Sequence, residues 1–173
     1  SIPKDIKILV DDDTEGLPAK VLARDSELDL IWLKITEPGE RRFATVDLKR
    51  ASNPRLGDRI LSIERKSDFY DRAAVISEDR VGGVFKKPRD LYAPSGGLFS
   101  DIGMPVFATD GGLVGIFVTH APEASHLDAG ETDWNDTEYL ILPAATLLKA
   151  TEQARKTESA PVQPAAGDED EEE

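Results

Sequence analysis

Cysteine is absent from the 173 residues, which excludes a disulfide framework and catalysis by a thiol. The chain also has no run of about 18 apolar residues, so no segment is expected to cross a membrane as a helix. Basic residues are few, with 21 Lys and Arg against 34 Asp and Glu and a net charge of −13. Because clusters of Lys and Arg bind phosphate backbones, nucleic-acid binding is not expected. The nearest basic run, Lys86 to Arg89, is interpreted as a solvated turn.

The end of the chain has a composition of its own. Residues 151–173 hold eight acidic and two basic residues, a net charge of −6, and the last six residues are all acidic. Such a segment cannot bury enough apolar surface to offset the entropy lost on ordering. We therefore expect a disordered acidic tail over 157–173, which attracts a basic partner or simply adds solubility.

Helical periodicity is also scarce until the end of the chain, whereas β-branched residues with period-two alternation dominate the first 120 positions. The predicted strands are 7–10, 19–23, 29–35, 59–63, 73–77, 104–108, 113–118 and 139–142. With no helices between them, these strands predict a barrel or a sandwich. A helix over about 143–156 should cap it, with one face formed by Ala144, Leu147, Leu148, Thr151 and Ala154.

Four segments, in this order, resemble the trypsin-like protease domain of the HtrA (DegP-like) family. Residues 18–35 end in Asp-Leu-Ile-Trp-Leu-Lys-Ile, similar to the family's D-L-A-x-L-K-I, and residues 56–63 resemble the x-G-D-x-V-x-A-I that opens its second barrel. Residues 101–116 are similar to N-S-G-G-P-L-x-x-x-D-G-x-V-V-G-I, and residues 140–154 to the closing F-A-I-P strand and helix. The resemblance covers residues 7–155 and implies an all-β, trypsin-like double β-barrel with a C-terminal helix.

The resemblance also implies a division of the chain into three regions. Residues 1–54 would be a remnant of the first barrel, 55–156 the second barrel with its helix, and 157–173 the tail. In the family further strands precede position 7, so the first barrel is expected to be incomplete here. A half barrel leaves unpaired edges and uncovered apolar side chains. Either residues upstream of Ser1 or another copy of the chain, forming an oligomer, would complete it.

The catalytic positions follow from the same resemblance. Acyl transfer by this fold needs a hydroxyl nucleophile, a histidine base, an orienting aspartate and backbone donors for the oxyanion. Asp29 takes the place of the aspartate, whereas the serine's place is taken by Ile102, which has no nucleophilic atom. The oxyanion-loop positions are Ser100, Asp101 and Gly103. The family's glycines two before and two after the serine are replaced by Ser100 and Met104, which reduces the freedom of this loop.

The histidine base has no counterpart in the chain. His120 and His126 both lie downstream of the nucleophile loop, whereas the family's base lies upstream of the first strand pair. Asp29 is then interpreted as a structural hydrogen-bond acceptor. Ser95 remains an alternative nucleophile because Ser95-Gly96-Gly97 imitates the family's S-G-G. It lacks the following proline, however, and precedes Gly115 by twenty positions instead of thirteen.

Neither a cofactor nor a metal site is expected. The loop from His120 to Asp133 offers nitrogen and oxygen ligands, but its spacing fits no zinc pattern, and we interpret it as a solvated acidic loop. Residues 11–16 begin like a calcium loop, yet the twelfth position is Leu22 instead of a glutamate, and we interpret them as a hairpin turn.

The sequence therefore predicts a catalytically inactive trypsin-fold module that binds or scaffolds protein or peptide ligands. The old substrate groove would receive an extended peptide by edge pairing, which needs no serine. Its expected contact residues are Leu98, Phe99, Met104, Phe117, Val118 and Thr119. Two alternatives are an active serine endopeptidase with a substitute nucleophile and a structural domain of a larger protein. The resemblance alone implies a location outside the cytoplasm.

Overall fold

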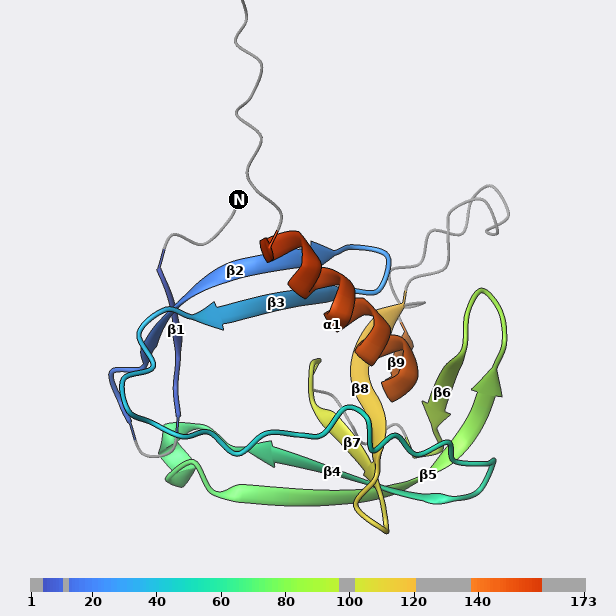
Figure 1. Ribbon diagram of the computed structural model, residues 1–173. Coiled ribbons are helices and arrows are strands. Elements are labelled where there is room, and N and C mark those ends of the chain that lie inside the picture. Colours follow the sequence, from blue (N-terminus) through green and yellow to red (C-terminus); the bar gives the residue numbers. More distant parts are fainter. Residues whose placement is uncertain (1–4, 11–12, 97–101, 121–137, 160–173) are drawn as a thin grey trace, which may run out of the picture.

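A computed structural model describes residues 5–10, 13–96, 102–120 and 138–159 (Figure 1). Nine strands, one short 3-10 helix and one α-helix occur in this part of the chain. In order they are β1 (Ile6–Ile8), β2 (Leu17–Asp25), β3 (Leu30–Ile35), β4 (Arg59–Arg65), η1 (Asp68–Tyr70), β5 (Ala74–Phe85), β6 (Leu91–Pro94), β7 (Pro105–Ala108), β8 (Leu113–His120), β9 (Glu138–Pro143) and α1 (Ala144–Ser159). No helix in these ranges is long and apolar enough to cross a membrane.

The first three strands form an open antiparallel sheet in the order β1-β2-β3. Ile6 lies opposite Ala19, and Ala19 lies opposite Ile35. The predicted hairpin turn is confirmed in its described part, because the Asp13 Oδ1 atom accepts the N–H groups of Glu15 (2.9 Å) and Gly16 (3.1 Å). Both outer strands pair with β2 alone in the described residues, so the sheet does not close. The first barrel is thus incomplete in this chain.

The other six strands close into a barrel in the order β4-β5-β6-β9-β8-β7. Alternate residues of these strands point inward and form one apolar cluster, as period-two alternation predicts. Its buried members are Ile60, Val81, Tyr92, Val106, Val114, Phe117 and Ile141. The barrel therefore contains the main core of the molecule.

Helix α1 joins the barrel to the open sheet. It starts directly after β9 and runs across to β2 and β3 (Figure 1). Ala144, Leu147 and Ala154 are buried, as the predicted helical face requires. Trp32 on β3 donates its indole N–H to the Thr151 Oγ1 atom at 3.1 Å, so the helix also fixes the open sheet.

The structure corrects the sequence-based strands in one region. β5 continues to Phe85 instead of ending near Ser77, and it pairs with β6, which had not been predicted. The predicted end of the strand was wrong because Gly82 and Gly83 are typical of a strand break. A Cβ atom at Gly82 would lie 2.7 Å from the Ser95 Cα atom, so glycine here allows the neighbouring backbone to approach.

Candidate functional site

The loop that would carry the nucleophile is described from Ile102 onward. Ile102 lies in the turn before β7 with 55% of its surface exposed. The next residue, Gly103, has a φ of 84° and donates its N–H to the Phe117 carbonyl at 2.7 Å. Phe117 donates its own N–H to the Met104 carbonyl at 3.0 Å, so the loop is fastened to β8. At the position expected for the serine, the loop therefore presents an apolar side chain to solvent.

Asp29, which the resemblance places at the triad aspartate, lies in the turn between β2 and β3 with a φ of 56°. Its Oδ2 atom accepts the Thr119 N–H at 3.0 Å and the Thr119 hydroxyl at 2.6 Å. The carboxylate thus connects the open sheet to β8 of the barrel. The side chains of His120 and His126 lie outside the described residues. These two hydrogen bonds agree with the expectation that Asp29 is a structural acceptor.

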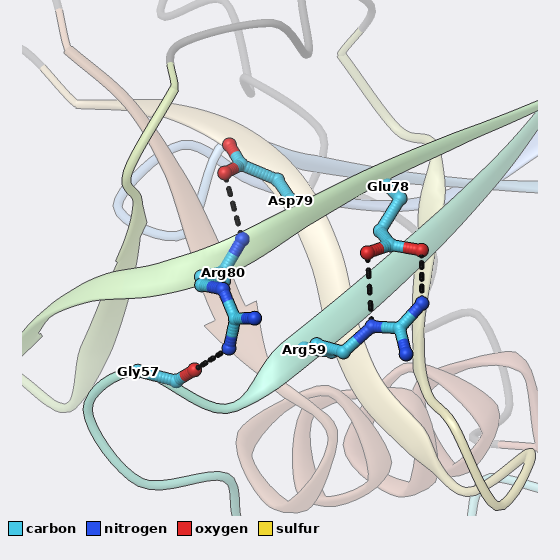
Figure 2. Close-up of polar contacts among 5 residues, drawn as sticks. All are labelled: Gly57, Arg59, Glu78, Asp79 and Arg80. Atoms are coloured by element: carbon cyan, nitrogen blue, oxygen red, sulfur yellow. Dashed lines mark hydrogen bonds and ion pairs between the residues drawn. The ribbon is translucent and has the colours of Figure 1, made fainter.

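Ser95, the alternative nucleophile, is bonded to a carboxylate. Its hydroxyl donates to the Asp79 Oδ1 atom at 2.6 Å, and the Gly96 N–H donates to Oδ2 at 2.9 Å. The Arg80 N–H donates to Oδ1 at 2.7 Å (Figure 2). Burial opposes the ionisation of Asp79, which is only 9% exposed, but these hydrogen bonds outweigh it and hold the Asp79 pKa below its usual value. A carboxylate with a lowered pKa is a poor base for activating a serine.

The Asp79 contact was missed by the sequence analysis, although a signal for it exists. Asp79 pairs with Ile60 and stands two residues before Val81, so it occupies an inward-facing strand position. Its neighbours Glu78 and Arg80 face outward. The Arg59 guanidinium binds Glu78 at 2.9 and 2.5 Å, and Arg80 donates to the Gly57 carbonyl at 2.8 Å (Figure 2). A charged residue in the inward register indicates a buried polar contact.

Comparison with known proteins identifies the family. A family model described as a trypsin-like peptidase domain matches residues 3–116. The chain belongs to this family. A search of curated proteins found no match.

Trypsin-like architecture also agrees with a solved structure. The crystal structure of the MamO protease domain from Magnetospirillum magneticum (apo form) is similar to this chain with a TM-score of 0.55. The two sequences are 16% identical, and the match covers 80% of this chain and 71% of that one. At this identity the likeness concerns the fold alone.

The expected contact residues of this trypsin-like domain are only partly brought together. Leu98, Phe99, Ser100 and Asp101 lie outside the described residues. Met104 is partly buried against the barrel core, while Phe117 and Val118 are 0% and 3% exposed and belong to the core. A ligand could meet only the backbone of these last two residues. The bonds of Phe117 to Gly103 and Met104 already occupy part of that backbone, and the neighbouring Thr119 N–H is bonded to Asp29.

Metal-binding side chains do not gather in the described residues, where no three His, Asp or Glu are grouped as an ion would require. Most of the acidic loop that begins at His120 lies outside these residues.

Proposed function

We propose that this trypsin-fold domain is catalytically inactive and acts by binding protein or peptide ligands. The observation that carries the proposal is the exposed isoleucine at position 102, where acyl transfer needs a hydroxyl. The bonds of Asp29 to Thr119 and of Ser95 to Asp79 support it, because each residue has a partner other than a histidine.

The proposed binding surface is the nucleophile loop. Ile102 is 55% exposed, and Met104, two residues further on, is partly buried. An apolar side chain presented where the family places its reacting atom favours contact with an apolar ligand group. Thr119 would border this surface, whereas the other expected contact residues, Leu98 and Phe99, lie outside the described residues. A location outside the cytoplasm and a role for the acidic tail both remain predictions.

A fluorophosphonate probe tests the lack of catalysis. The chain should remain unlabelled under conditions in which trypsin is labelled stoichiometrically. Ile102→Ser should also remain unlabelled, because the substitution restores a hydroxyl without a base. Stoichiometric labelling that Ser95→Ala abolishes would overturn the proposal in favour of an active peptidase.

Peptide arrays test the binding surface. Peptides that bind the chain should lose at least about tenfold in affinity when Ile102→Glu places a charge in the loop. Ile76→Glu is the matched control, because Ile76 is 67% exposed on the outside of the barrel. If the two variants and the unaltered chain bind the peptides equally well, the ligand does not bind at the nucleophile loop.

A further inference from the structure

A cleft of about 410 Å³ lies between the end of β1 and the tip of the β4–β5 hairpin. We call it the tip cleft. Its lining residues are Leu9, Arg65, Lys66, Ser67, Asp68 and Arg72. None of them belongs to the nucleophile loop or to the groups bonded to Asp29 and Asp79.

Three cations and one carboxylate line the tip cleft, although the chain as a whole has a net charge of −13. Arg65 donates to the Arg72 carbonyl at 3.1 Å, and Arg72 donates to the Asp13 carbonyl at 2.9 Å. These acceptors are neutral, so the two bonds orient the guanidinium groups without cancelling their charge. Lys66 forms an ion pair with Glu64. The two arginines keep further N–H donors in the planar arrangement that matches a carboxylate.

The turn that holds Arg72 has an uncommon backbone conformation. Asp71 and Arg72 are consecutive and have φ values of 54° and 50°, in the left-handed region that favours glycine. The Arg72 N–H donates to the Ser67 carbonyl at 3.2 Å and the Ala73 N–H to the Tyr70 carbonyl at 3.0 Å, which holds the turn in this form. Strained residues that their surroundings hold in place concentrate at functional sites.

Two aromatic residues are exposed on the same hairpin tip. Phe69 is 84% exposed and Tyr70 is 62% exposed. Their ring centroids are 4.9 Å apart at an interplanar angle of 87°, so they form an edge-to-face pair. Aromatic and arginine side chains with ordered positions are the residues that most often dominate binding energy at protein interfaces. The tip therefore offers apolar and cationic contacts side by side.

We propose that the tip cleft binds an acidic peptide segment of a partner protein. Carboxylates of the segment bind Arg65 and Arg72, and an apolar side chain packs against Leu9 and Phe69. The positive charge of the two arginines favours an acidic segment over a basic one. The exposed aromatic pair favours a segment that carries an apolar residue beside its carboxylates. The interaction uses no group of the nucleophile loop, so it holds whether or not the domain hydrolyses peptides.

Fluorescence anisotropy on the full chain tests the ligand chemistry. The probe is a fluorescein-labelled octapeptide of alternating Glu and Leu, with alternating Lys and Leu, or Glu and Ser, as control peptides. At about 20 mM salt the Glu-Leu peptide should bind at least about tenfold tighter than either control, and more weakly at about 150 mM salt. Equal binding of the Lys-Leu peptide would overturn the proposal.

Variants test the position of the site. Arg65→Gln, Lys66→Gln and Phe69→Ser should each weaken binding of the Glu-Leu peptide, the first and last by about tenfold. Arg59→Gln is the matched control, because this arginine is on the same hairpin but binds Glu78 outside the cleft. Thermal unfolding midpoints should show that every variant used is folded. Unchanged binding by both Arg65→Gln and Phe69→Ser, or an equal loss with Arg59→Gln, would overturn the assignment.

A shortened chain that ends at residue 159 distinguishes two possible occupants of the tip cleft, a partner protein and the chain's own acidic tail. The Glu-Leu peptide should bind the full and the shortened chain within about twofold of each other. Binding that occurs only after removal of residues 160–173 would identify the acidic tail as the occupant and overturn the proposed partner.

Discussion

The open sheet and the closed barrel are built from the same kind of strand but differ in burial. No described residue before Ile60 is buried, and Ile31 and Leu33 on β3 are 49% and 39% exposed. In the barrel, by contrast, Phe117 and Ile141 are 0% exposed. Period-two alternation produces a core only where the sheet closes on itself or is covered by another layer. We infer that the barrel and α1 carry most of the stability, and that the open sheet depends on its contacts with them.

Gly115→Ala should have the largest effect, because Gly115 packs against another strand of the closed barrel. A Cβ atom at this position of β8 would overlap the carbonyl of Leu142 on β9. Backbone on both sides prevents relaxation, so we expect a loss of more than about 4 kcal/mol in the free energy of unfolding, or no folding. Urea denaturation followed by circular dichroism measures this loss in the free energy of unfolding.

Gly39→Ala is the control outside the barrel. Gly39 has a φ of 60° and open space around its Cα, so the substitution should cost only about 1–2 kcal/mol for the left-handed backbone. Equal losses at the two glycines would contradict the proposed difference between the regions.

Truncation of one isoleucine in each region tests the comparison directly. Ile141→Ala removes a side chain that is 0% exposed and should cost about 3 kcal/mol through lost burial and the cavity left behind. Ile31→Ala removes a half-exposed side chain of the open sheet and should cost less than about 1 kcal/mol. Chemical denaturation of both variants measures the two losses in the free energy of unfolding. A larger loss at Ile31 would indicate that another molecule covers the open sheet under the conditions used.

Asp79→Asn should have a smaller effect that depends on pH. The hydrogen bonds to Asp79 favour its ionised form, so its pKa is lower in the folded than in the unfolded chain. The resulting stabilisation is present above the usual aspartate pKa of about 3.9 and is lost as the pH falls through the lower folded value. We expect Asp79→Asn to cost about 1–2 kcal/mol at pH 7, and the difference from the unaltered chain to disappear at low pH.

Stability curves from pH 7 to pH 2 measure this dependence. Asp90→Asn serves as the control, since Asp90 is an exposed carboxylate paired with Lys86, and it should change stability little across the range. A difference between Asp79→Asn and the unaltered chain that stays constant to pH 2 would indicate that the charge of Asp79 is not responsible.

Four features could be predicted from the residues alone: the β character of the chain, the hairpin at its start, the C-terminal helix and the family. These rest on local patterns, namely strand alternation, the face of α1 and the four ordered segments, of which residues 140–154 are the last. That residue 102 carries no hydroxyl is equally visible in the sequence, because a side chain's chemistry does not depend on its surroundings.

Contacts between groups that are distant in the sequence became visible in the folded chain alone. Asp29 reaches Thr119 across 90 positions, Ser95 reaches Asp79, and Arg72 of the hairpin tip reaches the Asp13 carbonyl of the open sheet. No local pattern encodes such pairs, since each depends on how the barrel closes and on where the open sheet and the hairpin tip then lie. The tip cleft exists for the same physical reason, because its walls come from segments more than 50 residues apart.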